Sequence, residues 1–294
     1  MGEIFDVKVP LSNYNFVKAT VQLFGSRGKN PPVAAQDIED ATWEQLLLSL
    51  VAFSKNVTVT DQEIQDEITN MLQAENAGFD WKTDKAAYEG WLKEKVRVPA
   101  TVFENQVRHL LQIDKLRNLV RDGMNPEIPE TQARQEFMMD KSKLNLELVK
   151  FAEEKEADEF YKKVKGRFRV WEKEKKRNPK IFKRPGFVTL TYLNKLWSIP
   201  QDALEKMLEK DKDEIYPPRA MYKGWGIFKI LEKKVADEAG FLQEKEGYYE
   251  KVRNRKKNEG LSEWIRQLKV QAKIKIYPKE GGKDEKSNLR DAGS

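Results

Sequence analysis

The chain has 294 residues, of which 39% are hydrophobic and 35% charged, with no cysteine, one histidine and a formal net charge of +6. These apolar residues suffice to bury a core, so the chain should fold, and its length favours two lobes or one domain with an insertion. The lack of cysteine excludes disulfides, thiolate metal sites and cysteine nucleophiles, and the single histidine, His109, argues against zinc, so we expect neither a metal nor a cofactor.

No apolar run approaches the roughly 18–20 residues that a membrane-spanning helix needs. The opening residues 1–6 lack the basic and apolar regions of a signal peptide. We therefore expect any signal or membrane anchor to lie outside this chain.

The first part of the sequence shows helical periodicity after a short extended start. Capping-box spacing at Thr42 and again at Thr60-Asp61-Gln62-Glu63 predicts two helix starts. A shorter helix is expected near 84–95, a long one from Thr101 and another from Pro129. Because no one of these helices hides its apolar face alone, the set should pack as a bundle.

The pattern then changes to alternating strands and helices. Strands are predicted at 144–151, 186–193 and 224–231, and helices lie between them, one of which opens at Pro200. Tyr216-Pro217-Pro218 reads as a break. This order predicts a small α+β domain, followed by a long helical stretch over 240–272 and a short strand at 274–277.

The last strand of this small domain carries the most specific motif. Gly224-Trp225-Gly226-Ile227-Phe228-Lys229-Ile230 resembles the closing strand of parvulin prolyl isomerases, in which a histidine follows the aromatic residue. Gly226 stands at that histidine position, and residues 146–149 lack the second histidine of the family. Of two further family segments, only remnants are visible at 184–187 and 198–202. The resemblance therefore implies the fold and no catalytic residue.

The flanking segments resemble the same wider group. The helix start at 59–64 and the pattern at 103–116 are similar to the SurA-type N-terminal chaperone domain, and 262–276 resembles the segment that returns to complete it. The chain thus resembles the SurA/PrsA/PpiD chaperones. This implies an α+β fold, with a mainly helical N-terminal lobe that a C-terminal helix completes and an inserted parvulin-like domain. The implied domains are 1–142 (helical), 143–235 (parvulin-like), 236–277 (returning helix and strand) and 278–294 (disordered tail).

The function implied by this resemblance is that of a holdase. Unfolded or nascent extracytoplasmic or outer-membrane proteins would bind in a cradle between the two lobes, in the periplasm or another extracytoplasmic compartment. No phosphate-binding glycine motif is present, so binding should not need ATP. The alternative is an active parvulin-type prolyl isomerase with rewired residues. A structural or nucleic-acid-binding module is a third class, and we expect no nucleic-acid partner.

The resemblance also places candidate client-binding residues near the parvulin cleft. These are Phe187, Trp197, Tyr222 and Trp225, for which core packing is the open alternative. His109 has no recognisable catalytic partner and is interpreted as a partly exposed structural residue.

Two basic runs complete the set of candidates. The runs at 162–184 and 253–257 fit a solvated helix face, a surface for acidic clients or lipid, or, less well, a nucleic-acid surface.

Overall fold

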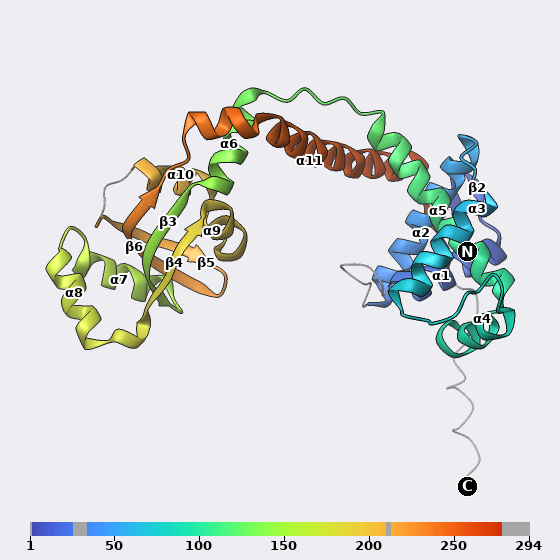
Figure 1. Cartoon of the computed structure of the whole chain (residues 1–294), viewed down its shortest axis with the longest axis horizontal. Coiled ribbons are helices and arrows are strands. Elements are labelled where there is room, and N and C mark those ends of the chain that lie inside the picture. The colour runs from blue at the N-terminus through green and yellow to red at the C-terminus, as the bar shows by residue number, and fades with distance from the viewer. Residues whose placement is uncertain (1, 26–33, 210–212, 278–294) are drawn as a thin grey trace, which may run out of the picture. The chain divides into compact units, whose positions relative to one another are not determined.

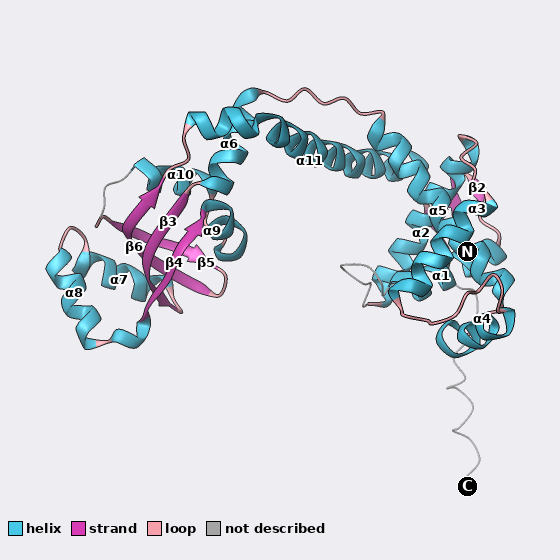
Figure 2. Cartoon of the chain, viewed as in Figure 1, coloured by secondary structure: helices cyan, strands magenta, loops and turns pink. Residues whose placement is uncertain are grey.

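The computed structural model describes residues 2–25, 34–209 and 213–277 and shows an α+β protein, the fold class that the sequence predicted (Figures 1 and 2). The expected disorder of the tail concerns residues outside this described part. The chain divides into two compact units: unit 1 comprises Met1–Asn125 and Lys257–Ser294, and unit 2 comprises Pro126–Lys256. None of the helices that the structure describes is both long and apolar enough to cross a membrane.

The two units meet in sequence at 125/126 and 256/257, whereas the expected domain boundaries were at 142/143 and 235/236. The helix α6 (Glu130–Lys141) and the first part of α11 (Glu238–Ala272) both belong to unit 2. They share an apolar cluster in which the ring of Phe137 packs edge-to-face on Phe241 at 5.6 Å and on Tyr248 at 5.3 Å.

Unit 1 is a helical bundle with a small antiparallel sheet. The helices α1, α2 and α5 and the end of α11 share one apolar core, and α3, α4, η1 and α5 share a second. The sheet has the strand order β2-β1-β7. The elements are β1 (Gly2–Ile4), β2 (Val7–Lys8), α1 (Leu11–Gly25), α2 (Ala35–Ser54), α3 (Asp61–Ala74), α4 (Lys85–Trp91), the π-helical turn η1 (Leu92–Val96), α5 (Ala100–Asp122) and β7 (Lys275–Ile276).

One of the two predicted capping boxes is confirmed and the other is wrong. Thr60 caps α3: its hydroxyl accepts from the Glu63 N–H at 3.3 Å, and the Glu63 carboxylate accepts from the Thr60 N–H at 2.8 Å. Thr42 instead lies buried inside α2, which begins seven residues earlier at Ala35. Its hydroxyl donates to the Ile38 carbonyl at 2.7 Å, so mid-helix bonding, rather than capping, explains this threonine.

The C-terminal segment completes the core of unit 1. Leu268 and Ala272 of α11 are buried with residues of α1 and α2. β7 pairs with β1, where Gly2 faces Ile276. A side chain on Gly2 would come within 2.2 Å of the Lys275 carbonyl oxygen and 2.5 Å of the Trp43 ring, so only glycine fits between them.

Unit 2 is built on a four-stranded antiparallel sheet with the order β4-β3-β6-β5. The helices α6, α9 and α10 cover one face, called here the α9 face, and α7 and α8 cover the other, called the α8 face. Its elements, besides α6 and the first part of α11, are β3 (Lys143–Phe151), α7 (Glu154–Val164), α8 (Phe168–Arg177), η2 (Pro179–Ile181), β4 (Phe182–Thr189), α9 (Leu190–Trp197), α10 (Gln201–Glu209), β5 (Ile215–Met221) and β6 (Gly224–Lys234).

Two sequence predictions are wrong in unit 2. The expected break at Tyr216-Pro217-Pro218 is strand β5, which tolerates proline because it is the outer strand and the register shifts between Tyr216 and Arg219. The strand predicted for 186–193 ends at Thr189, whose hydroxyl accepts from the Tyr192 N–H at 3.1 Å and so caps α9. The β-branched and aromatic residues of this stretch had favoured a strand, and the local cap decides for a helix.

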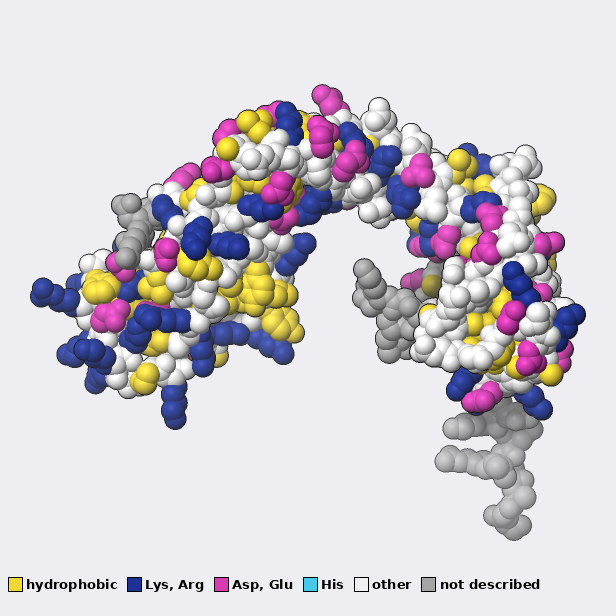
Figure 3. All heavy atoms as spheres, in the orientation of Figure 1, with side chains coloured by type: hydrophobic (Ala, Val, Ile, Leu, Met, Phe, Trp, Pro, Cys, Tyr) yellow, Lys and Arg dark blue, Asp and Glu magenta, His cyan; other side chains and the backbone are white. Residues whose placement is uncertain are grey.

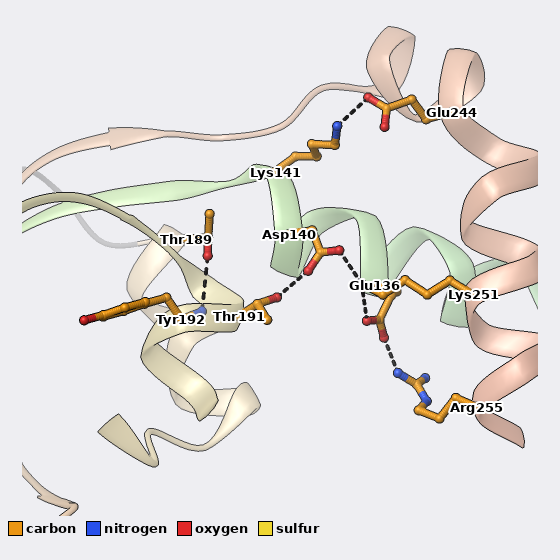
Figure 4. Close-up of polar contacts among 9 residues, drawn as sticks. All are labelled: Glu136, Asp140, Lys141, Thr189, Thr191, Tyr192, Glu244, Lys251 and Arg255. Carbon is orange, nitrogen blue, oxygen red and sulfur yellow. Dashed lines mark hydrogen bonds and ion pairs between the residues drawn. The ribbon is translucent and has the colours of Figure 1, made fainter. Parts of the chain in front are cut away.

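A polar network joins α6, α9 and α11 within unit 2 (Figure 4). The Asp140 carboxylate accepts from the Thr191 hydroxyl of α9 at 2.6 Å and also from Lys251 of α11. Glu136 pairs with Lys251 at 2.9 Å and with Arg255. Burial alone would raise the pKa of Asp140, but the hydrogen bonds from Lys251 and Thr191 outweigh it and lower that pKa. The C-terminal half of α6 thereby links the long helix α11 to α9 of the sheet domain.

Candidate functional site

Gly226 is the residue that the sequence resemblance aligns with the catalytic histidine of parvulins. It lies buried in β6, on the α9 face of the unit 2 sheet. A Cβ atom on Gly226 would lie 2.2 Å from Met221 Sδ, 2.9 Å from Phe228 Cζ and 3.1 Å from Leu148 Cδ1. Side chains of three strands therefore fill the space that a histidine would occupy.

The first strand of the sheet contributes mostly apolar residues to this face; its one lysine here, Lys150, pairs with Gly226 and alternates with Leu146 and Leu148. Leu146 and Leu148 of β3 are buried here among apolar residues, together with Phe228 and Ile230 of β6. General acid–base chemistry needs a group within hydrogen-bond reach of the reacting atom. The residues packed around Gly226 are thus mostly apolar.

Trp197 lies beside this filled position. Its ring stacks on that of Phe228, with centroids 5.9 Å apart and an interplanar angle of 23°. Tyr192 meets Trp197 edge-on at 6.2 Å, and Tyr192 and Leu196 are 42% and 57% exposed. Trp197, Tyr192 and Leu196 form what we call the α9 surface. Figure 3 shows hydrophobic side chains gathered on this side of unit 2.

Sequence reasoning found Trp197 but missed Tyr192 and Leu196, because the predicted strand 186–193 included the first half of α9 and hid the helical spacing of these two residues. In a strand, Tyr192 and Leu196 would point to the same side as Asn194, because every second residue shares a face. In a helix they lie one turn apart on the exposed side. The Thr189 cap is the signal that could have located them.

Tyr222 lies in the turn between β5 and β6. It is 64% exposed and follows Met221, the residue that fills the Gly226 position. Its carbonyl accepts from Lys150 Nζ at 3.0 Å, and the Lys223 ammonium lies 5.1 Å from the centre of its ring. The exposed aromatic ring is thus flanked by positive charge.

The structure does not bring the four predicted residues together. Trp225 packs on the α8 face with Phe151 and Phe160. Phe187 neighbours Val188, which packs on the α9 face, so strand alternation puts Phe187 on the other side, where the Lys234 ammonium lies 4.2 Å from its ring centre. Client binding by any of the four stays a prediction.

The α8 face holds a buried ionic cluster around Glu147, which is 0% exposed. Its carboxylate accepts from Trp171 Nε1 at 2.5 Å and from Arg184 Nε at 2.7 Å, and pairs with Lys175 Nζ at 2.7 Å. Burial alone would raise the pKa of Glu147, but the hydrogen bonds from Lys175, Trp171 and Arg184 outweigh burial and lower that pKa. An ionised, fully engaged carboxylate of this kind is a structural group.

A buried lysine extends this cluster. Lys229 faces Glu147 across the β3–β6 pair and is 2% exposed. Its ammonium lies 2.9 Å from Glu172 and 4.0 Å from the centre of the Phe168 ring. Part of the basic run at 162–184 is therefore engaged with carboxylates inside unit 2, although Lys and Arg side chains also gather on the surface over α7 and α8 (Figure 3).

His109, expected to be partly exposed, is buried in α5 of unit 1. Its ring packs edge-to-face on that of Phe16, with centroids 5.7 Å apart. The expectation was wrong because Phe16 of α1 packs on this side of α5, a contact that the helical periodicity of α5 does not reveal.

No family model matches the chain, and no curated protein matches it. Similar solved structures include one of the Campylobacter jejuni proteins PEB4 and Cj1289, two SurA-like chaperones (13% identity, 95% of this chain, 98% of that chain, TM-score 0.41). The peptidylprolyl isomerase PrsA of Bacillus cereus is similar at 15% identity (86% and 93%, TM-score 0.45). The foldase PrsA of Streptococcus pneumoniae is similar at 16% (93% and 93%, TM-score 0.34). These three structures are thus of a SurA-like chaperone and two PrsA proteins.

Proposed function

We propose that this protein is an ATP-independent holdase that binds unfolded polypeptides, with the α9 surface as a contact site. The observation that carries the proposal is the exposure of Tyr192 and Leu196 next to the half-buried Trp197, beside the filled Gly226 position. A group of large apolar side chains on a folded surface commonly marks an interaction site. Apolar contacts without directional polar groups suit clients of varied sequence.

The proposed clients are unfolded extracytoplasmic proteins, including outer-membrane proteins, and the proposed location is the periplasm or another extracytoplasmic compartment. Both follow from the sequence resemblance. Binding should be weak and reversible, because ordering an unfolded segment costs free energy that offsets the new contacts. Participation of both units in one cradle stays a prediction.

Substitutions on the α9 surface should weaken holdase activity. The double variant Tyr192→Ser, Leu196→Gln removes two exposed side chains, each of which contributes roughly 1.5–3 kcal/mol when fully buried by a client. We expect it to lose most of the suppression of light scattering when an unfolded outer-membrane protein is diluted from denaturant. The matched control is Leu242→Gln, because Leu242 is 60% exposed on α11 of the same unit.

The outcomes separate the site from the function. If the unaltered protein gives no suppression at several-fold molar excess, the holdase function is wrong. If the double variant and the control suppress equally well, the function stands and the α9 surface is not the contact site.

The alternative function is prolyl isomerisation by rewired residues, which the apolar surroundings of Gly226 would support by desolvating an amide. The barrier is about 18–20 kcal/mol, and the single histidine of the sequence, His109, lies in unit 1 and not on this face. We expect isomerisation of a proline peptide at close to the uncatalysed rate, measured in a protease-coupled assay.

Histidine alone should not restore activity in the variant Gly226→His, because Phe228 and Leu148 occupy its space. Catalysis well above background in the unaltered chain, abolished by Trp197→Ala, would establish the isomerase instead.

A further inference from the structure

The positive charge of this chain is concentrated in one segment of unit 2. Residues 162–184 hold twelve lysines and arginines and two glutamates, a formal charge of +10 in a chain whose total is +6. The rest of the chain therefore carries a formal charge of −4. The segment runs from the end of α7 through α8 into β4, where Lys and Arg side chains gather on the surface (Figure 3). So uneven a distribution points to a negatively charged partner for this surface.

The periodicity of α8 separates a buried side from a basic side. Trp171 and Glu174, three residues apart, are 0% and 7% exposed. Arg169, Lys173 and Lys176 follow the spacing i, i+4 and i+7 and so share the opposite side of the helix, where all three are exposed. We call these three residues the basic stripe.

The carboxylates of the segment do not neutralise the basic stripe. Glu172 pairs with the buried Lys229 at 2.9 Å, and Glu174 pairs with Lys163 at 2.6 Å and with Arg177 at 3.6 Å. No residue of the basic stripe forms an ion pair within the described part of the chain. The charges of the stripe therefore remain available to a partner.

Two exposed apolar side chains flank the basic stripe in the sequence. Phe168 is 48% exposed at the start of α8, and Ile181 is 39% exposed just before β4. A surface that combines long basic side chains with exposed apolar ones suits the boundary of an anionic bilayer. There the apolar groups enter the headgroup layer, and the basic groups meet the lipid phosphates.

A single-stranded nucleic acid suits the same surface less well. Such partners stack their bases on exposed aromatic rings. Trp171 and Phe182 pack instead in the apolar cluster of the α8 face, where their rings meet edge-to-face at 5.2 Å. The Phe168 ring already has the Lys229 ammonium 4.0 Å from its centre. Charge together with apolar exposure thus favours a lipid surface.

We propose that unit 2 binds the surface of an anionic lipid bilayer through the basic stripe, with Phe168 and Ile181 as apolar contacts. The proposal does not depend on the holdase function, but the two are compatible. The helices α8 and α9 cover opposite faces of the unit 2 sheet. Binding to a membrane through α8 therefore leaves the α9 surface open to unfolded polypeptides.

The test measures sedimentation of the full chain with two kinds of vesicle, phosphatidylcholine alone and phosphatidylcholine with phosphatidylglycerol in equal parts. We expect binding to the anionic vesicles only, and loss of this binding as salt is raised, because ions screen exposed charges. The triple variant Arg169→Gln, Lys173→Gln, Lys176→Gln should bind about 100-fold more weakly, since each basic residue near an anionic surface contributes roughly 5-fold.

The matched control removes the same charge elsewhere. The variant Lys82→Gln, Lys85→Gln, Lys93→Gln alters three exposed lysines of unit 1 and should bind the anionic vesicles like the unaltered chain. Ile181→Ser tests the apolar contact. It should weaken vesicle binding several-fold and leave the affinity for soluble polyglutamate unchanged.

Three outcomes would overturn the proposal. The first is a lack of binding to anionic vesicles at low salt, and the second is equal binding by the triple variant and its control. The third is tighter binding to polyglutamate or single-stranded DNA than to the vesicles, with no effect of Ile181→Ser, because the partner would then be a soluble acidic polymer. The variant Tyr192→Ser, Leu196→Gln should bind vesicles normally, so a negative holdase result leaves this proposal intact.

Discussion

A chain that ends at Glu259 will lose the fold of unit 1, whereas a chain that ends at Tyr277 will keep it. The shorter chain lacks Leu268 and Ala272, which are 9% and 0% exposed in the main core of this unit. It also lacks β7 and the hydrogen bond from the Phe5 N–H to the Ala272 carbonyl at 2.8 Å. Losing one large buried side chain costs about 2–5 kcal/mol, and a whole domain has about 5–15 kcal/mol of stability.

Hydrogen exchange followed by mass spectrometry checks this prediction, because it reports each unit separately. Peptides from α1, α2 and α5 should exchange rapidly in the chain that ends at Glu259. Peptides from β3 and β6 of unit 2 should keep their protection. Equal protection of α1 and α2 in both truncated chains would show that the C-terminal segment is dispensable.

Replacement of Glu147 by alanine will destabilise unit 2 by about 3–5 kcal/mol, the cost of removing one partner from a buried ion pair. The change removes the acceptor of the Trp171 indole N–H. Trp171 is fully buried, so no water can replace that acceptor. It also leaves Arg184 and Lys175 without their carboxylate. Glu147→Gln should cost less, because its amide oxygen can still accept from Trp171. Urea denaturation followed by tryptophan fluorescence measures both losses.

The exposed Glu232 of β6 provides the matched control, and Glu232→Gln should change the free energy of unfolding little. The pH dependence gives a further check. Because the pKa of Glu147 is lowered in the folded protein, its contribution is present above the unfolded value near 4.5 and is lost as the pH falls through the folded value. Glu147→Gln should therefore flatten the acid side of the stability curve. A curve identical to that of the unaltered protein would contradict the role of Glu147.

Much of the fold could be predicted from residue patterns, and the errors have local causes. β3 and β6 are long stretches rich in aliphatic residues with partial alternation, and Thr60 has its reciprocal partner Glu63, so these predictions are confirmed. β5 was missed because two prolines signal a break unless the strand is known to lie at a sheet edge. That edge position is a property of the whole sheet and is invisible in a single segment.

The candidate site was predictable only in part. Trp197 was found through the parvulin resemblance, but its neighbours depend on α9 being a helix. The burial of His109 could not be predicted from sequence, because the ring that packs on it belongs to Phe16 of α1, far away along the chain. Glu147 follows the strand pattern imperfectly, and nothing near it in sequence shows that Trp171, Lys175 and Arg184 would surround it.

The pairing of β1 with β7 has a consequence for the order of folding during synthesis. Unit 2 is one continuous stretch, so it can fold once residues up to 256 have emerged from the ribosome or the translocation channel. Unit 1 begins first but is completed last, because its first strand waits for residues 275–276. Contacts between such distant residues form slowly, and until then α1, α2 and α5 expose apolar faces. The nascent chain therefore passes through a stage in which its own first helices need protection from aggregation.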